Sequence, residues 1–381
     1  MKSNAASVRI VASTVSRLWS TGIMLNRRSF TAIAVCAPTR FLGAEPRTFQ
    51  ALPAALGQLE HINGGRLGVA VLDTGTGERS GHRANERFPM CSTFKFLLAS
   101  AVLQRVDRRL EKLDRTIAIP PKPLLPNSPL SEPNAGGAMT VSALCHAALI
   151  RSDNTAANLL LESIGGPSSI TGFAQSIGDT VTRLDRTEMS LNQSLAGDPR
   201  DTTSPEAMLG DLKSVLLGNV LSSASREQLT RWMEANLTGL ERLRAKLPAG
   251  WRAADKTGSN GEHTTNDIAV LWPAGKPPVI IAAYTTQCAG SEAKRAAMLA
   301  EIGRLVRESL TRQTTNCLPL PANPLALLPI WADNALRVPF GWPTTKRNDI
   351  PKALNGTRYM DVVWKLVISI SGRCHTSLLG A

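Results

Sequence analysis

The chain has few cysteines and no long apolar run, and each absence excludes a class of protein. Its 381 residues contain six cysteines, at positions 36, 91, 145, 288, 317 and 374. Their spacings match no metal-ligand pattern and no dense disulfide framework. We therefore expect no metal, no cofactor and no disulfide within the core, although one bridge could form in an oxidising compartment. No stretch reaches the ~20 apolar residues that span a bilayer, so we expect no stable membrane association of the mature domain.

The net charge of +13 is concentrated at the two ends of the chain. Residues 1–50 hold seven Lys/Arg and one acidic residue, and residues 311–381 hold eight and three. Residues 51–310 are left with 28 basic and 26 acidic side chains, a net charge of +2. Nucleic-acid binding needs a concentrated basic surface, so we expect no nucleic-acid partner.

The first 44 residues indicate an export signal. Asn26-Arg27-Arg28-Ser29-Phe30 carries the twin arginine of such a signal and precedes the mildly apolar segment Thr31–Ala37. Two arginines on a solvated helix are the alternative. We expect residues 1–44 to be an N-terminal extension followed by a twin-arginine-type signal peptide that starts at Met24. The mature protein is then periplasmic.

Hydrophobic periodicity predicts strands near both ends of the chain and helices between them. The strands are expected over residues 66–72, 78–84, 252–256, 267–272 and 279–286. The helices are expected over residues 48–60, 92–106, 140–150, 154–164, 168–177, 204–217, 225–236 and 291–310. This order predicts an α/β protein of the α+β sandwich type, with an antiparallel five-stranded sheet, flanking helices and an all-helical lobe.

The catalytic domain is expected over residues 45–310. Its sheet lobe takes residues 45–86 and 237–310, and its helical lobe takes residues 87–236. Residues 311–381 show no convincing periodicity and contain a proline-rich run, so we expect a disordered or misannotated tail.

Ser92-Thr93-Phe94-Lys95 is the first of four motifs that suggest chemistry. On a helix, the i, i+3 spacing puts the Ser92 hydroxyl and the Lys95 amine on one face, where an amine can activate a serine without histidine. Backbone amides at the helix start could stabilise the oxyanion of acyl transfer. Taken singly, Ser92 could be a helix cap and Lys95 a solvated amine.

Ser152-Asp153-Asn154 is the second motif. The Ser152 hydroxyl could relay a proton to a leaving nitrogen, and the Asn154 amide could hold a substrate carbonyl. A cap for the following helix is the alternative reading of Asp153.

Glu188 and Asn192 form the third motif. An acyl-serine persists until water is activated, and a positioned carboxylate can be the general base. Asn192 could hold the same water. A loop carboxylate paired with Arg186 or Arg183 is the alternative.

The fourth motif, Lys256-Thr257-Gly258-Ser259, falls at the end of an expected strand. The Lys256 amine and the hydroxyls of Thr257 and Ser259 could bind a carboxylate, and Gly258 would let a substrate approach the backbone.

With these motifs in register, residues 47–310 resemble the class A serine β-lactamases. Four longer stretches are similar to the extended-spectrum, cephalosporin-hydrolysing branch; they are Arg87–Cys91, Arg183–Glu188, Asp198–Thr203 and Thr264–Val270. The resemblance implies a β-lactamase/transpeptidase-like fold and hydrolysis of penicillins and cephalosporins, hence antibiotic resistance. It also implies a monomer.

The resemblance also implies residue roles. Ser92 is the acylated nucleophile, and Lys95 is its partner in proton transfer. Ser152 relays the proton, and Asn154 contacts the acylamide side chain. Glu188 is the base for deacylation.

Further implied roles concern binding and the loop that carries Glu188. Both Glu188 and Lys95 stay open as acceptors of the first proton. The amides of Ser92 and Ser259 form the oxyanion hole. An Arg186–Asp201 ion pair closes the loop, and breaking it should alter specificity more than fold.

The chain departs from the family pattern in two places. Many members carry an arginine on the strand after Lys-Thr-Gly, where this chain has residues 262–265, Glu-His-Thr-Thr. Arg242 is our candidate to replace it at the substrate carboxylate. Cys91 precedes the nucleophile, as in carbapenem-hydrolysing members, but Asn260 stands where their partner cysteine would be. We therefore predict neither that disulfide nor strong carbapenem hydrolysis.

Three other functions compete with hydrolysis. A penicillin-binding D,D-peptidase shares the Ser-x-x-Lys scaffold but lacks a deacylating glutamate. A β-lactam-sensing domain stays acylated, and a binding module would lack intact motifs. The joint motif match favours the hydrolase.

Overall fold

The computed structural model describes residues 49–316, with side chains described up to residue 311. The expected export signal, the tail beyond residue 316, and Cys36, Cys317 and Cys374 lie outside the described residues. Helices long and apolar enough to cross a membrane are absent between residues 49 and 316.

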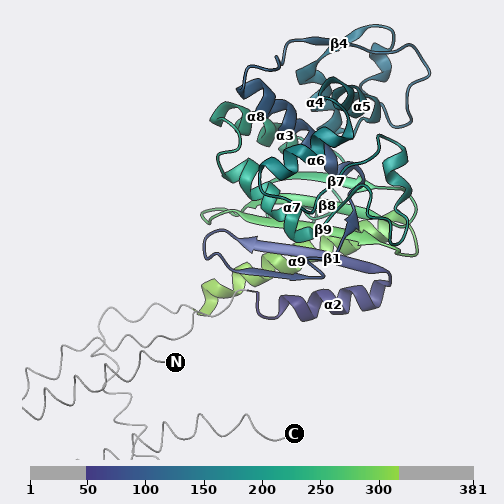
Figure 1. The fold of residues 1–381 in the computed structure, drawn as a ribbon. Helices are drawn as coiled ribbons and strands as arrows, with labels where there is room; N and C mark the ends of the chain where they lie inside the picture. Colours follow the sequence, from purple (N-terminus) through teal and green to yellow (C-terminus); the bar gives the residue numbers. More distant parts are fainter. Residues whose placement is uncertain (1–48, 317–381) are drawn as a thin grey trace, which may run out of the picture. The chain divides into compact units, whose positions relative to one another are not determined.

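A five-stranded antiparallel sheet forms the centre of the described part (Figure 1). Its strand order is β2-β1-β9-β8-β7. The strands are β1 (Arg66–Asp73), β2 (Arg79–His82), β7 (Arg252–Ser259), β8 (Thr265–Trp272) and β9 (Val279–Thr286). β1 pairs with β9 along its whole length, from Arg66 opposite Thr286 to Asp73 opposite Val279. Segments from the two ends of the chain therefore build one sheet, which confirms the predicted fold class.

Both faces of the sheet are buried, because alternate residues of its strands enter two hydrophobic cores. Val69, Ala269 and Ile281 belong to one core, and their neighbours Ala70, Ile268 and Ile280 belong to the other. This is the period of two that a strand imposes on its side chains.

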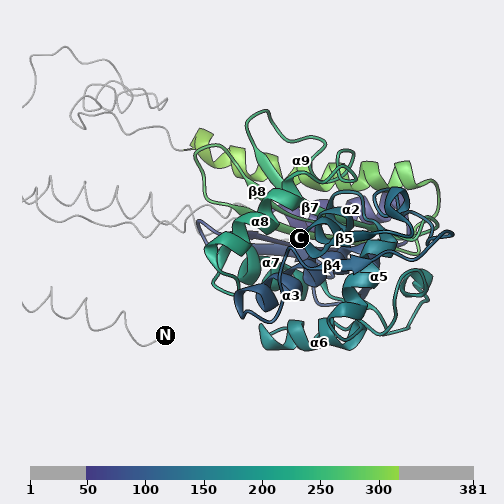
Figure 2. The ribbon, with the colours of Figure 1, turned by 90° about the horizontal axis from the view of Figure 1, so that it is seen from above.

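Terminal helices cover one face of the sheet, and the helical lobe covers the other (Figures 1 and 2). The terminal helices are α2 (Leu52–Asn63) and α9 (Glu292–Asn316). The helical lobe contains α3 (Phe94–Asp107), α4 (Val141–Ile150), α5 (Asn154–Ser163), α6 (Pro167–Ser176), α7 (Pro205–Leu212) and α8 (Ser223–Glu234). Ten of the fourteen residues of α3 are buried, which makes it the central helix of the lobe.

Side-chain caps begin several of these helices. The Thr140, Asp153, Ser204 and Ser222 side chains each accept a bond from the backbone N–H three residues on. Such caps satisfy amides that have no partner within the helix. Asp153 is therefore a helix cap, as its alternative reading held, and this cap orients Ser152 and Asn154 on either side of it.

Two predicted helices differ from the structure. The helix expected to begin at Ser92 starts as a 3-10 turn, Cys91–Thr93, and becomes α-helical only at Phe94. The helix expected to run to Leu217 ends at Leu212 and continues as a π-helical turn. Apolar spacing is nearly the same for these helical forms, so periodicity does not separate them.

Two small strand pairs were absent from the prediction. β3 (Phe88–Pro89) pairs with β6 (Thr202–Thr203), and β4 (Thr116–Ala118) pairs with β5 (Ala138–Thr140). Strands of two or three residues are too short to show alternation. The β3–β6 pair ties the segment before Ser92 to the end of the loop that carries Glu188.

Candidate active site

Ser92 lies in the 3-10 turn that enters α3, directly against the end of β7. The preceding residue, Cys91, has a positive φ of 45°, so the backbone turns sharply there. A Cβ atom on Gly258 would lie 2.6 Å from the Met90 carbonyl oxygen and 3.2 Å from the Ser92 nitrogen. Only glycine permits this approach. It brings the predicted Lys-Thr-Gly-Ser motif beside the predicted nucleophile.

Ser92, Lys95 and Glu188 meet at one carboxylate oxygen. The Ser92 hydroxyl donates to Glu188 Oε1 over 3.0 Å. Lys95 Nζ lies 2.9 Å from the same oxygen, and both charged side chains are fully buried. Because the amine and the serine share this acceptor, a proton can pass among all three groups.

Lys95 also binds the Ser-Asp-Asn motif. Its Nζ donates to the Ser152 carbonyl oxygen over 2.8 Å, to Ser152 Oγ over 3.3 Å and to Asn154 Oδ1 over 2.7 Å. Burial lowers the pKa of Lys95, and the charge of Glu188 opposes that shift. Lys95 is therefore an internal amine with four acceptors and not the solvated lysine of the alternative reading.

A second buried lysine approaches Ser152 from the sheet. Lys256 Nζ donates to Ser152 Oγ over 3.2 Å and to the Thr257 carbonyl oxygen over 2.7 Å. Burial lowers the pKa of Lys256 well below its usual value, and the charges of Lys95 and Arg242 lower it further. The Ser152 hydroxyl thus lies between two amines that can supply or accept its proton.

Two asparagines hold Glu188 in place. Asn192 Nδ2 donates to Glu188 Oε2 over 2.6 Å; its predicted contact with a shared water stays a prediction. Asn158 Oδ1 accepts from the Glu188 backbone N–H over 2.9 Å, and Asn158 Nδ2 donates to the Glu188 carbonyl oxygen over 2.8 Å. The sequence prediction missed Asn158. Its position four residues after Asn154 on one helix was the available signal, because such residues share a face.

Arg183 and Arg186 pair with other carboxylates, so Glu188 is not a loop carboxylate paired with either arginine. Arg186 Nε lies 2.5 Å from Asp201 Oδ2, and Arg183 pairs with Asp185. Asp201 also accepts the backbone N–H groups of Asp185 and Arg186 over 2.8 and 2.9 Å. The predicted Arg186–Asp201 pair is present; its effect on specificity stays a prediction.

Arg242 lies behind β7, the strand that carries Lys256–Ser259, with 7% of its surface exposed. Its Nη1 donates to the carbonyl oxygens of Gly258 and Asn266 over 3.0 and 2.7 Å, and its Nη2 donates to Glu292 Oε1 over 2.8 Å. Arg242 therefore holds β7 and β8 together at their active-site end. The prediction missed Glu292, which stands at the start of α9, far from every motif in the sequence.

Cys91 is a free, buried thiol, as are Cys145 and Cys288. The Cys91 Sγ atom lies 3.7 Å from Ser194 Oγ. Asn260 accepts bonds from the backbone N–H groups of the three residues Glu262, His263 and Thr264 and so shapes the β7–β8 turn. Asn260 thus occupies the position where the resemblance would need a partner cysteine for Cys91.

The part of the chain that the structure describes contains no set of side chains arranged to bind a metal ion. No group of three or more His, Cys, Asp or Glu side chains there could hold a metal ion. The site brings together the hydroxyls of Ser92 and Ser152, the amines of Lys95 and Lys256 and the carboxylate of Glu188 through a chain of hydrogen bonds.

Comparison with known proteins identifies relatives that all belong to one enzyme family. Residues 51–310 match the model of the β-lactamase enzyme family. β-Lactamase L2 of Stenotrophomonas maltophilia is 51% identical over 265 residues, covering 69% of this chain and 88% of that protein. The carbapenem-hydrolysing β-lactamase KPC of Klebsiella oxytoca is 45% identical over 66% of this chain and 87% of its own length. CTX-M-25 of Escherichia coli is 42% identical over 74% and 97%.

Solved structures agree with these sequence relatives. A reconstructed ancestral class A β-lactamase has a TM-score of 0.67 and 56% identity, covering 68% of this chain and 99% of that one. A β-lactamase from Xanthomonas campestris has a TM-score of 0.68 and 48% identity over 69% and 99%.

Proposed function

The chain belongs to the class A serine β-lactamases and is a β-lactam hydrolase, and from this premise we propose how its own residues perform the reaction. The β-lactam amide of a penicillin or cephalosporin acylates Ser92, and water activated by Glu188 then hydrolyses the acyl-enzyme. The family supports a role in antibiotic resistance.

One observation carries this proposal. Ser92 Oγ and Lys95 Nζ lie 3.0 and 2.9 Å from the same oxygen, Glu188 Oε1, inside a buried site. A nucleophile beside a general base is the arrangement that activates a serine. Because the base is a carboxylate, it can also activate the water that releases the product.

In acylation, the Ser92 oxygen attacks the lactam carbonyl carbon as its proton leaves. Glu188 Oε1, which accepts the Ser92 hydroxyl, and Lys95 Nζ, which lies 2.9 Å from that oxygen, are the two candidates to take that proton. The backbone amides of Ser92 and Ser259 are the expected donors to the oxyanion, since the close approach of Gly258 brings the two segments together. When the amide bond breaks, the nitrogen receives the Ser152 hydroxyl proton, which Lys95 or Lys256 can replace.

In deacylation, a water molecule attacks the ester carbon while Glu188 takes its proton. Asn192 donates to Glu188 Oε2, and its own Oδ1 atom is buried without a donor among the described residues. That oxygen is available to accept a hydrogen bond from the attacking water. The bonds from Asn158 to the Glu188 backbone keep the carboxylate oriented during this step.

Substrate binding is assigned to the second lysine and its strand. Lys256, Thr257 and Ser259 bind the substrate carboxylate, with the positive charge of Arg242 directly behind Gly258. Asn154 Nδ2 donates to the Pro126 carbonyl oxygen, which leaves its second hydrogen for the acylamide carbonyl of the substrate. Because Cys91 is a free thiol, we do not expect strong carbapenem hydrolysis.

The test is a turnover assay on the purified full-length chain with a chromogenic cephalosporin. We expect many product molecules per enzyme molecule, because the carboxylate that deacylates is in contact with the nucleophile. Intact-mass spectrometry during turnover should show a transient acyl adduct. A stoichiometric burst with no further product would instead identify a peptidase or a β-lactam-sensing domain.

We further propose that the protein is exported to the periplasm by the twin-arginine route. We also propose that the mature protein is a monomer. The Arg27-Arg28 pair is the observation that supports the export route. Replacing both with lysine, Arg27→Lys and Arg28→Lys, should move activity from the periplasmic to the cytoplasmic fraction of the cell. Unchanged fractionation would reject the twin-arginine route.

A further inference from the structure

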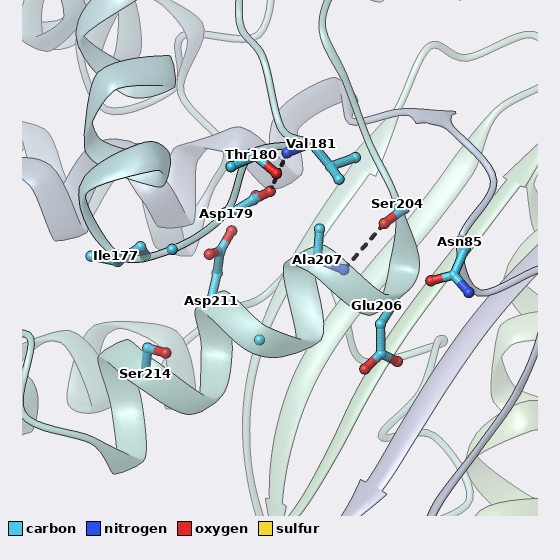
Figure 3. Close-up of a pocket in the computed structure, with 12 residues that line it drawn as sticks. Asn85, Ile177, Asp179, Thr180, Val181, Ser204, Glu206, Ala207, Asp211 and Ser214 are labelled. Atoms are coloured by element: carbon cyan, nitrogen blue, oxygen red, sulfur yellow. Dashed lines mark hydrogen bonds between the residues drawn. The ribbon is translucent and has the colours of Figure 1, made fainter.

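A cavity of about 290 Å³ lies on the helical lobe beside α7, and the catalytic groups do not line it. Figure 3 shows its lining, which comes from the connection after α6, from α7 and from Asn85. Asp179 and Asp211 are both part of this lining. They are two buried acids that the proposed chemistry leaves unused.

The two carboxyl groups face each other. Figure 3 shows the Asp211 carboxyl group pointing from α7 toward Asp179, and the two groups are within hydrogen-bonding reach. Asp179 Oδ1 accepts the backbone N–H groups of Val181 and Thr182 over 2.7 and 3.0 Å. Neither Asp179 Oδ2 nor Asp211 Oδ2 has a hydrogen-bond donor among the described residues, although both atoms are buried.

Two facing, buried oxygens without a donor are costly if both carboxyl groups are ionised. Like charges repel strongly in a medium of low dielectric constant, and a buried acceptor without a donor loses the hydrogen bonds that water gave it. One proton placed between the carboxyl groups removes both penalties, because it cancels one charge and supplies the missing donor.

Among residues 49–311, no hydrogen bond or ion pair joins a basic side chain to the Asp179 or Asp211 carboxyl group. On β9, the Tyr284 hydroxyl bonds to Thr93 Oγ1 over 3.3 Å, and burial raises the pKa of Tyr284, so that its phenol stays neutral. On α7, Glu206 pairs with Arg79 of β2. On the π-helical turn, Lys213 is exposed.

The charged groups of the adjoining strands are engaged elsewhere. On β1, Arg66 pairs with Glu86, and Asp73 accepts the Gly75 N–H. On β8, Asp267 accepts the Leu243 N–H.

The carboxyl pair stands at the neck of the Glu188 loop, residues 182–203. The two ends of this loop are joined by a bond from the Arg183 N–H to the Thr202 carbonyl oxygen over 3.0 Å. The hydroxyls of Thr182 and Thr203 bond over 2.6 Å. Asp179 precedes the loop, and Asp211 lies on the helix that follows it. A bond between them therefore also joins the segments that flank the two ends of the loop.

We propose that Asp179 and Asp211 share one proton and that this carboxyl–carboxylate hydrogen bond fastens the neck of the Glu188 loop. Asp211 is then a positioning residue for deacylation, a role that rests on the proposed function of Glu188. Burial, followed by the charge of Asp179, raises the pKa of Asp211 well above 3.8, in agreement with a retained proton.

The proton makes stability depend on pH with a definite sign. Because the folded-state pKa of Asp211 is raised, its stabilising effect is complete below the ordinary value of 3.8 and is lost as pH rises through the raised value. Asparagine at position 211 would donate a permanent N–H to Asp179 and would not titrate. The melting temperature of wild type should therefore fall relative to Asp211→Asn by about 3–5 °C per pH unit across that window.

The experiment compares full-length wild type, Asp211→Asn, Asp211→Ala and Glu206→Gln between pH 5 and pH 9. Thermal melts and acyl-enzyme decay rates are measured for each. Glu206→Gln is the matched control, since it changes a carboxyl group of the same helix and cavity; its melting temperature should stay parallel to that of wild type. Asp255 and Asp267, whose pKa values burial also raises, titrate alike in all four proteins.

We expect Asp211→Asn to retain deacylation at the upper end of the pH range, where wild type slows, and Asp211→Ala to be slower at every pH. Parallel melting profiles for wild type and Asp211→Asn would overturn the shared proton. Diverging melts with identical decay rates would overturn the positioning role. If Glu188 were not the base, the melts would still diverge, and only the assignment of the catalytic step would fail.

Discussion

Substitution of Glu188 by alanine is expected to lower steady-state turnover by about 10²–10⁴-fold, the range of general-base catalysis. Ser92 would still be acylated, but the attacking water would lose its proton acceptor. The chromogenic assay should show a burst equal to the enzyme concentration, and mass spectrometry should find the acyl-enzyme persisting. The matched control is Glu227→Ala on α8, where the side chain is 68% exposed.

The same variant separates the two candidates for the first proton. Glu188 is the main group that raises the pKa of the buried Lys95, so its removal lowers that pKa further and favours the neutral amine. If Lys95 can take the Ser92 proton, the burst should be as fast as wild-type acylation. A burst slowed as much as turnover would assign the first proton to Glu188. Undiminished turnover would show that Glu188 is not the base.

Replacement of Ser92 by alanine is expected to lower kcat by about 10⁶-fold, the loss seen when a serine hydrolase loses its nucleophile. Lys256, Thr257 and Ser259 remain, so the substrate should still bind. No acyl adduct should appear by mass spectrometry. The fold should be kept, because the Ser92 hydroxyl bonds only to Glu188 in this structure.

Ser100→Ala is the matched control for this substitution. Ser100 is buried on the same helix, and its hydroxyl donates to the Phe96 carbonyl oxygen over 2.7 Å, within the helix. It should keep near wild-type turnover. An acyl adduct on Ser92→Ala, or turnover within tenfold of wild type, would place the nucleophile elsewhere.

Most of the fold was predictable from local patterns. All five strands of the central sheet and the long helices were found, because alternation and 3.6-residue periodicity arise from neighbours in sequence. The 3-10 turn at Cys91–Thr93 was not found, since it depends on the positive φ of Cys91 and on the packing of Gly258 against Ser92. Strands as short as Thr202–Thr203 show no period at all.

The predicted catalytic residues were likewise brought together, but their supports were not foreseen. Asn158 clamps the Glu188 backbone, and Glu292 pairs with Arg242 from the start of α9. Neither belongs to a motif, and each matters only because an element from elsewhere in the chain packs against it. Arg242 was expected at the substrate carboxylate; its visible contacts are carbonyl oxygens of β7 and β8, so its contribution to binding stays a prediction.

By itself, the sequence determined the order of strands and helices and the four short motifs, and through them the family. The tertiary structure decided which groups Glu188 meets. Glu188 pairs with Lys95 and not with the nearby Arg183 or Arg186, and its partner Ser92 stands 96 positions away. Periodicity and motif spacing reflect contacts within one turn or strand. Burial, by contrast, joins residues from distant elements and selects the pairs that can be charged, hydrogen-bonded and dry at once.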